Sequence, residues 1–426
     1  MSQQLPSAFW SRRRLLASLS LAVLAIAITA WAGATGVFGP DRHPDPAATS
    51  QPAQSSTARA GASTPQPATE SSSAPTPSSG TSVPLVPSPR ASRPAAIQLD
   101  PGSWSNQKLA AVLVMTGAKM GDTAAIQHAA ARGVGGIVLF GPTSPRLART
   151  LRMAATAAPR GNPPLIASDE EGGQVQRLSS LIYPLPSAEA MGRWSPAKIT
   201  ATARSYALRM RALGVTVALS PDADLAVPGY YIATARRSFS ADPRQVAIAV
   251  NAWNDGLRAA GVLGVIKHWP GHGQATDTHV GGSLVPRWSV LQRRDLIPFR
   301  AAFAHHVDAV MVGHLRVPGL TEGSWPASES PAALRALRAQ AGGAVLIVTD
   351  DLSMDAASKT LGISASKAAV RSLVSGADVA MVCWAPLDGV TSAVKQAIDD
   401  GRLPRSQAVA SARRVLQTKM RVTAQR

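Results

Sequence analysis

Short apolar runs alternate with longer amphipathic stretches from about residue 97 to the end of the chain. In the amphipathic stretches, such as 242–260 and 365–375, apolar residues recur at the spacing of a helix with one buried face. Short apolar runs that end in polar residues are typical of strands buried in a parallel sheet. We predict eight such strands, at 109–115, 135–140, 164–167, 215–219, 262–266, 308–312, 345–349 and 378–382.

Eight strands that alternate with helices predict a (β/α)8 barrel of the TIM type. A further helical stretch at 406–421 would close the barrel. An open, doubly wound sheet is the alternative arrangement. The sequence shows no internal repeat and no second folded domain, so we expect one catalytic barrel over residues 98–426.

The first 38 residues have the pattern of a targeting segment. Ser11-Arg12-Arg13-Arg14 is followed by a run without charged residues that ends at Phe38. A basic flank before such a run indicates an export signal or a membrane anchor, and the double arginine resembles a twin-arginine signal. Ala30-Trp31-Ala32 offers a cleavage site, whereas the length of the run favours a retained anchor. Either reading places the rest of the chain outside the cytoplasm, membrane-anchored or secreted.

Residues 39–97 are rich in Pro, Ser, Thr and Ala and carry few large apolar side chains. Such a segment buries too little surface to offset its ordering entropy. We therefore predict a disordered linker that holds the barrel away from the membrane.

Composition narrows the classes of partner and chemistry. The 426 residues carry a formal charge of +18, without a basic-aromatic module of the kind that binds nucleic acid. Attraction to an anionic cell envelope explains the basic balance more simply. Cys383 is the single cysteine, so an intrachain disulfide and a cysteine metal cluster are both excluded. A small buried hydrophobe is the expected role of Cys383.

Polar clusters follow five of the predicted strands. In a parallel barrel the ends of the strands meet on one rim, which is where such proteins place their chemistry. A single Asp at a strand end is more often a helix cap than a catalyst, and we expect a cap at Asp351. Five clusters on one rim are hard to explain as caps. They lie at 168–177, 220–224, 267–279, 313–314 and 350–354.

The segment 267–279 is the most polar of these clusters. It holds Lys267 and three histidines beside a proline and two glycines. A solvated loop, a metal site and an acid–base site are three readings of this segment alone. In the metal reading, zinc would bind to His268, His272, Asp277 and His279. In the acid–base reading, Asp277 would orient His279.

These clusters resemble the bacterial β-N-acetylglucosaminidases of glycoside hydrolase family 3. Lys267-His268-Trp269-Pro270-Gly271-His272-Gly273 is similar to the family's Lys-His-Phe-Pro-Gly-His-Gly signature. Similar blocks stand at 169–177, at 237–239 with 242–243, and at 349–354, in the order found in the family. The resemblance runs from about residue 105 to about residue 420 and departs at 274–276, where the loop is one residue shorter.

The resemblance implies a role for each matching residue. Asp350 would be the nucleophile, and His279 the general acid/base, paired with Asp277. The terminal sugar would bind to Asp169, Arg177, Arg237, Lys267 and His268. For His272 and His314 we expect packing roles. For Trp269, Trp288 and Trp384 we expect core or rim positions rather than a sugar platform.

The resemblance further implies a retaining β-N-acetylglucosaminidase that forms a covalent glycosyl-enzyme on Asp350. The expected substrate is terminal, non-reducing, β-linked N-acetylglucosamine on cell-wall muropeptides. We expect a monomer without a metal or organic cofactor. Three alternatives remain: a glycoside phosphorylase of the same fold, a sugar-binding protein without turnover, and a metal-dependent hydrolase that uses the four candidate zinc ligands.

Overall fold

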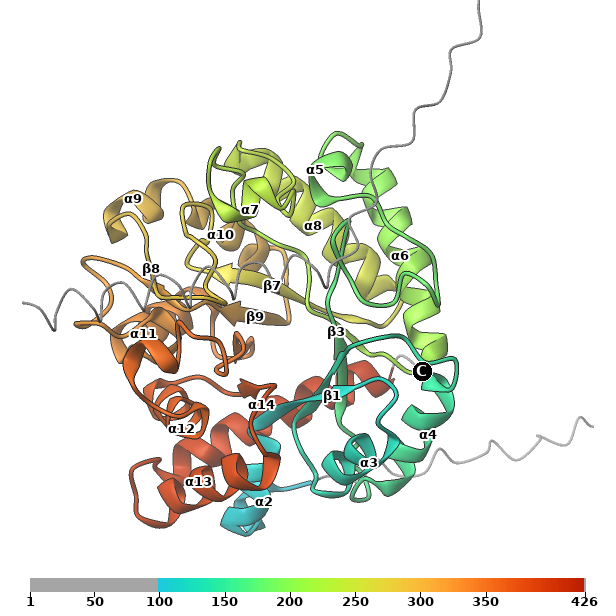
Figure 1. The fold of residues 1–426 in the computed structure, drawn as a ribbon, viewed down its shortest axis with the longest axis vertical. Helices are drawn as coiled ribbons and strands as arrows, with labels where there is room; N and C mark the ends of the chain where they lie inside the picture. The colour runs from blue at the N-terminus through green and yellow to red at the C-terminus, as the bar shows by residue number, and fades with distance from the viewer. Residues whose placement is uncertain (1–98, 425–426) are drawn as a thin grey trace, which may run out of the picture. The chain divides into compact units, whose positions relative to one another are not determined.

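The computed structural model describes residues 99–424, and its central feature is a parallel sheet of eight strands (Figure 1). The strands are adjacent in the order β11-β9-β7-β6-β3-β2-β1-β12. They are β1 (Val114–Lys119), β2 (Gly136–Phe140), β3 (Leu165–Ser168), β6 (Val217–Ala218), β7 (Leu263–Trp269), β9 (Ala309–Val312), β11 (Leu346–Thr349) and β12 (Ala380–Val382).

The two edges of the sheet approach each other, so the barrel is nearly closed. A parallel bridge joins Val348 of β11 to Val379, beside β12, and the Thr349 amide donates to the Val379 carbonyl at 3.0 Å. Strand neighbours also follow chain order, without the reversal of a doubly wound sheet. The predicted (β/α)8 barrel is therefore confirmed, and the open-sheet alternative is wrong.

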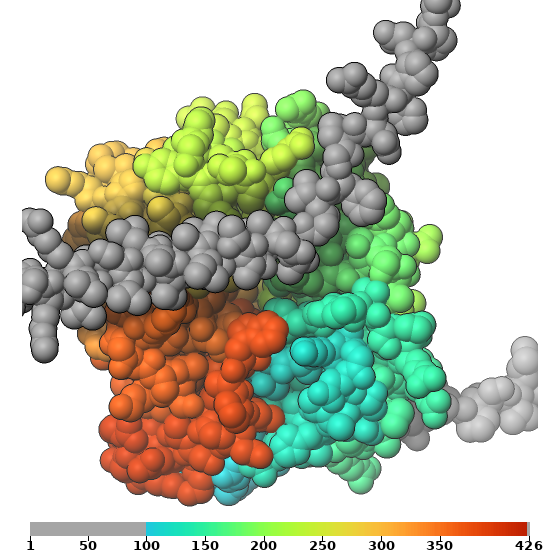
Figure 2. All heavy atoms as spheres, viewed as in Figure 1, coloured from blue at the N-terminus to red at the C-terminus, as the bar shows by residue number. Residues whose placement is uncertain are grey.

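Helices surround the sheet in Figure 1 and mostly alternate with its strands along the chain. In Figure 2 the last part of the barrel, in orange and red, lies against its first part, in cyan. They are α2 (Asn106–Val112), α3 (Thr123–Ala131), α4 (Leu147–Ala157), α5 (Ala188–Met191), α6 (Pro196–Leu213), α7 (Tyr231–Thr234), α8 (Pro243–Ala259), α9 (Trp288–Arg293), α10 (Leu296–Ala304), α11 (Pro331–Ala341), α12 (Ala365–Ser375), α13 (Leu387–Asp399) and α14 (Arg405–Ala424). Four shorter strands lie in the connections: β4 (Glu170–Gly172), β5 (Val175–Gln176), β8 (Ser283–Leu284) and β10 (Leu315–Arg316).

Helix ends follow local sequence signals. In α6, the Ser195 hydroxyl accepts the Lys198 amide, Pro196 stands in the first turn, and Gly214 ends the helix at a φ of 94°. Only glycine takes that left-handed conformation at little cost. These signals explain why helix bounds predicted from the sequence differ little from those observed for α8, α12 and α14.

Successive residues along the strands belong to different apolar clusters. In β9, Met311 packs in one buried cluster and Val310 in the other, and in β2 the same holds for Val138 and Ile137. Strands buried on both faces need apolar residues at every position, which is why the sequence shows runs rather than alternation.

The first predicted strand, at 109–115, is a correction. Most of that run forms α2, where the Ser105 hydroxyl caps the helix by accepting the Lys108 amide, and β1 begins only at Val114. Leu109 to Val112 are all buried in α2, which packs on α13 and α14. A helix whose last four residues are all buried has the same apolar run as a buried strand, so periodicity could not separate them.

The predicted targeting segment, 1–38, and the predicted linker, 39–97, lie outside the described residues. Residues 99–424 contain no helix that is long and apolar enough to cross a membrane. The described residues lie within the predicted catalytic domain, 98–426.

Candidate active site

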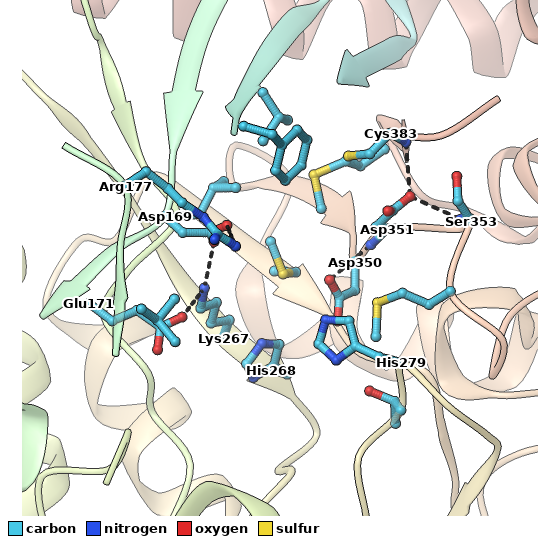
Figure 3. Close-up of a pocket in the computed structure, with 18 of the residues that line it drawn as sticks. Asp169, Glu171, Arg177, Lys267, His268, His279, Asp350, Asp351, Ser353 and Cys383 are labelled. Carbon is cyan, nitrogen blue, oxygen red and sulfur yellow. Dashed lines mark hydrogen bonds and ion pairs between the residues drawn. The ribbon is translucent and has the colours of Figure 1, made fainter. Parts of the chain in front are cut away.

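A cavity of about 490 Å³ opens at the carboxyl ends of the barrel strands (Figure 3). Its size is within the range of roughly 300–1,000 Å³ typical of ligand cavities. The structure brings to this cavity every residue that the sequence assigned to catalysis or sugar binding except Asp277, which stands behind His279. The lining residues among them are Asp169, Arg177, Arg237, Lys267, His268, His279 and Asp350.

Asp350 directly follows β11 and faces the cavity (Figure 3). Its backbone amide donates to the Val312 carbonyl of β9 at 2.9 Å, and its Oδ1 accepts the Asp351 amide at 2.8 Å. Burial raises the pKa of Asp350, but the nearby His268 charge and the Asp351 amide outweigh it, so that the pKa falls well below its usual range. The carboxylate is therefore ionised, as a nucleophile must be.

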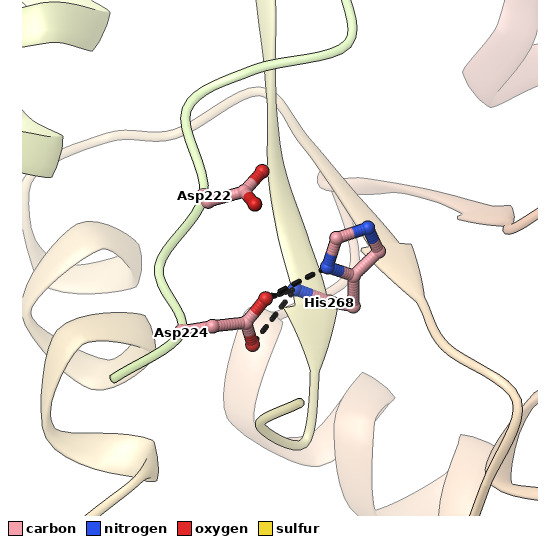
Figure 4. Close-up of side chains that lie close together, drawn as sticks. All are labelled: Asp222, Asp224 and His268. Carbon is pink, nitrogen blue, oxygen red and sulfur yellow. Dashed lines mark hydrogen bonds and ion pairs between the residues drawn. The ribbon is translucent and has the colours of Figure 1, made fainter. Parts of the chain in front are cut away.

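His268 is held by a buried carboxylate, Asp224 (Figure 4). Asp224 Oδ2 lies 2.7 Å from His268 Nδ1, and the same carboxylate accepts the backbone amides of His268 and His272. Burial lowers the pKa of His268, but the charge of Asp224 outweighs it and raises that pKa above the ordinary value. His268 thus keeps Nε2 for the cavity.

Lys267 links the acidic residues on the other side of the site. Its Nζ lies 2.5 Å from Glu171, 3.2 Å from Asp169 and 3.9 Å from Asp222. Burial alone would lower the pKa of Lys267, but these carboxylates, Glu171 first, raise it above the usual range. The ammonium group therefore stays charged although only 3% of the side chain is exposed.

Arg237 completes this buried ionic network. Its Nε and Nη2 donate to both oxygens of Glu171, at 2.7 and 2.9 Å, and Nε lies 3.3 Å from Asp222. Burial raises the pKa of Glu171, but Arg237 and Lys267 lower it to about 2. Burial and the neighbouring Glu171 charge raise the pKa of Asp222 to about 7. The cations thus hold Glu171 ionised.

His279 and Asp277 form the predicted dyad in the loop after β7. His279 Nδ1 lies 2.6 Å from Asp277 Oδ1, which also accepts the His279 amide at 3.0 Å. In Figure 3 the His279 ring projects into the cavity towards Asp350. Because Nδ1 is engaged by Asp277, Nε2 is the ring nitrogen that can exchange a proton with a ligand.

His272 supports the loop that carries His279. Its Nε2 lies 3.2 Å from the Thr278 hydroxyl, next to His279, and Tyr231 packs against both imidazoles at 6.1 and 6.5 Å between ring centroids. Burial and the His268 charge lower the pKa of His272 to about 4, so its ring is neutral at neutral pH. His272 also lines the cavity, and these contacts are consistent with the predicted packing role.

Comparison with known proteins identifies the family. The family model described as "Glycosyl hydrolase family 3 N terminal domain" matches residues 106–418. The chain is 38% identical over 333 residues to beta-hexosaminidase LpqI of Mycobacterium tuberculosis, a match that covers 75% of this chain and 84% of the relative. The chain belongs to glycosyl hydrolase family 3. It is therefore a glycoside hydrolase, as the motifs implied.

Solved structures agree with this family 3 assignment. A glycosyl hydrolase of the family from Mycobacterium smegmatis is 36% identical, with a TM-score of 0.70, and the match covers 75% of this chain and 98% of that one. A family 3 β-N-acetylglucosaminidase from Paenibacillus is 28% identical, also with a TM-score of 0.70, over 75% of this chain and 63% of that one.

The four residues of the metal reading do not form a compact ligand set in this family 3 hydrolase. Among residues 99–424, the one group of three or more potential ligands with converging atoms is Asp222, Asp224 and His268 (Figure 4). Two of its members already share a 2.7 Å hydrogen bond, and the third lies beside the cations Arg237 and Lys267. This donor set fits an ionic network better than a metal ion.

Asp351 differs from its prediction as a helix cap, because no helix begins there. Its Oδ1 accepts the amides of Ser353 and Cys383, each at 2.9 Å, so it ties the loop after β11 to the end of β12. His314 also packs against this loop, since its Nε2 bonds the Asp351 carbonyl at 2.9 Å. Cys383 is buried, as expected.

Several residues of the site had no assigned role in the sequence. Glu171, Asp222 and Asp224 stood within the polar clusters, so position after a strand was a signal that they could matter. The tryptophans differ: Trp269 is fully buried and Trp288 packs against it, whereas Trp384 lies at the rim of the cavity with 66% of its surface exposed. Tyr231 and Trp384 follow no motif that would have marked them.

Proposed function

We propose that this protein is a retaining β-N-acetylglucosaminidase that removes terminal, non-reducing N-acetylglucosamine from peptidoglycan fragments. The observation that carries the proposal is the joint placement of Asp350 and the His279–Asp277 dyad at one cavity. The named relatives support the substrate class, since they are a beta-hexosaminidase and a β-N-acetylglucosaminidase.

In the first step, the Asp350 carboxylate attacks the anomeric carbon and a carbon–oxygen bond forms. The glycosidic carbon–oxygen bond breaks at the same carbon, and the leaving oxygen takes the proton from Nε2 of a protonated His279. The low pKa of Asp350 favours this step because it keeps the attacking carboxylate ionised. The product is a covalent glycosyl-enzyme.

In the second step, neutral His279 takes a proton from water through the same Nε2. The water oxygen bonds to the anomeric carbon, and the ester bond to Asp350 breaks. Two displacements at one carbon retain its configuration. Asp277 orients the imidazole through its contact with Nδ1, as the buried carboxylate does in a serine protease triad.

The terminal sugar would bind on the polar side of the cavity. Asp169 can accept hydroxyl protons while its other contacts, Lys267 at 3.2 Å and Arg177 at 3.6 Å, hold it in place. His268 presents Nε2 to the cavity. Arg237 gives two of its five N–H donors to Glu171, so the remaining donors are those proposed for the sugar.

The cellular role rests on the segment before the barrel. The basic and then apolar pattern of 1–38 and the composition of 39–97 support export and a spacer. We therefore place a monomeric enzyme outside the cytoplasmic membrane, where it would meet muropeptides and an anionic envelope.

The deciding experiment is hydrolysis of a chromogenic β-N-acetylglucosaminide by the full chain and by Asp350→Ala, each with and without EDTA. We expect release that resists EDTA and is lost in the variant. Release abolished by EDTA would instead establish a metal-dependent hydrolase. Formation of a sugar 1-phosphate in phosphate buffer would establish a phosphorylase. Binding of the sugar without turnover would establish a binding protein.

A further inference from the structure

The mouth of the catalytic cavity carries an exposed indole. Trp384 follows β12, lines the cavity and exposes 66% of its surface. Among the large hydrophobic side chains that are exposed in residues 99–424, it is the one aromatic and the one that lines this cavity. An aromatic ring left in solvent beside a binding cavity is better explained by contact with a ligand than by packing.

Contacts on two sides hold Trp384 in position. Its ring packs on Phe140, at the end of β2, with 5.1 Å between centroids and an interplanar angle of 36°. Its backbone amide donates to the Ser353 hydroxyl at 3.1 Å. Ser353 is in the loop that carries Asp350, so the indole is fixed relative to the nucleophile. A fixed aromatic side chain binds a ligand at a low cost in conformational entropy.

The position of Trp384 determines which part of the substrate its side chain can contact. The buried groups Lys267 and Glu171 lie on one side of Asp350, while Cys383, the residue before Trp384, lies on the other (Figure 3). A terminal sugar held by the buried polar groups directs its glycosidic oxygen towards His279 and the mouth of the cavity. The exposed indole would then lie beside the leaving group, while Phe140, beneath it, also contacts Arg177 on the side of the terminal sugar, with 6.0 Å from the guanidinium to the ring centroid.

The sequence predicted a rim position for Trp384 rather than a sugar platform, but its exposure at the cavity changes this interpretation. We propose that Trp384, supported by Phe140, is the platform on which the leaving-group sugar packs. A pyranose presents a face of C–H groups that can pack on an indole while its hydroxyls stay in water. The inference rests on the proposed function and adds the residue that would favour glycosides whose leaving group is a second pyranose ring over those whose leaving group is a small alkyl alcohol.

The test compares two substrates of the full chain. One is the β-linked disaccharide of N-acetylglucosamine. The other is the methyl β-glycoside of the N-acetylglucosamine monosaccharide, which has no second ring. Binding energy from the second ring raises kcat/KM only while the platform is present. We expect Trp384→Ala to lower kcat/KM for the disaccharide about 10-fold or more, and for the methyl glycoside by less than about twofold.

Two variants and one inhibitor sharpen the comparison. Trp384→Phe should keep most of the disaccharide activity, and Leu284→Ala should change neither substrate, since Leu284 is 60% exposed but outside the cavity. Inhibition by free N-acetylglucosamine should be equal in wild type and Trp384→Ala, which would show an intact terminal-sugar site. Equal losses on both substrates, or no loss on either, would overturn this inference alone. A wild-type protein inactive on both would overturn the proposed function and this inference with it.

Discussion

Two histidines of one motif have pKa values that are shifted in opposite directions, which shows how single contacts set the chemistry of this site. His268 and His272 are both buried, and their ring centroids are 5.4 Å apart. Asp224 bonds the ring of His268 and raises its pKa, but it bonds only the backbone amide of His272, whose pKa falls to about 4. The imidazole with the raised pKa therefore lies on the side of the nucleophile, and a neutral imidazole supports the acid/base loop.

The effect of removing His279 from the His279–Asp277 dyad should depend on the leaving group of the substrate. His279→Ala should lower kcat/KM about 10²–10⁴-fold for a glycoside with a sugar leaving group, because no proton reaches the leaving oxygen. An activated dinitrophenyl leaving group needs little protonation, so its release should be much less affected. Steady-state kinetics with both substrates measures the difference.

Asp277→Asn is the matched control for this dyad, since it keeps the side-chain shape but removes the charge next to Nδ1. Asp277→Asn should show the same dependence on the leaving group as His279→Ala, with a smaller loss of kcat/KM. Added azide should restore turnover of the glycosyl-enzyme in His279→Ala, because an anionic nucleophile needs no general base. Equal losses with both leaving groups would contradict the acid/base role.

Among the elements, α14 performs the closing role that the sequence assigned to a C-terminal helix. From its last turns, Lys419 donates to the Val134 carbonyl at 3.0 Å and to Asn162 at 2.7 Å, and no carboxylate is among these partners. Burial lowers the pKa of Lys419 to about 7. Lys419 therefore fastens the helix to the loops after α3 and α4.

This lysine makes stability depend on pH. Between about pH 7 and pH 10 the unfolded chain holds a proton on Lys419 that the folded chain does not, so the free energy of unfolding should rise with pH. The contribution is up to about 1.4 kcal/mol per pH unit. Lys419→Met should remove this part of the increase in the free energy of unfolding with pH. Urea unfolding of both proteins at pH 7 and pH 9.5 measures this difference. An equal change in the free energy of unfolding between the two pH values in both proteins would show that Lys419 stays charged when folded.

For the whole molecule, a buried carboxylate helps to close the gap between β11 and β12, the two edges of the sheet. Asp378, just before β12, accepts the Ile347 amide of β11 at 3.0 Å and the Ser411 hydroxyl of α14 at 2.9 Å. It also pairs with Arg338 of α11 and Arg414 of α14. One side chain thus joins elements that are distant in the sequence.

Removing this charge should destabilise the barrel. Asp378→Asn leaves two guanidinium groups without their partner, and we expect the free energy of unfolding to fall by about 3 kcal/mol. Asp388→Asn is the control, because Asp388 is 59% exposed and its pairs with Arg132 and His128 contribute little. Chemical denaturation of the three proteins measures both effects. A change as small in Asp378→Asn as in the control would mean that closure does not depend on Asp378.

The sequence by itself determined seven of the eight strands, the approximate bounds of α8, α12 and α14, and the chemical types at the rim, because apolar runs, helix caps and polar clusters are local patterns. It misplaced the first strand, where a buried helix has the same local pattern. Tertiary structure decided which groups meet: Asp224 and His268 are 44 positions apart, and Glu171 and Arg237 are 66 apart. It also decided that Trp384 stands in solvent at the cavity. Contact and exposure depend on elements far away in the chain, which no local pattern encodes.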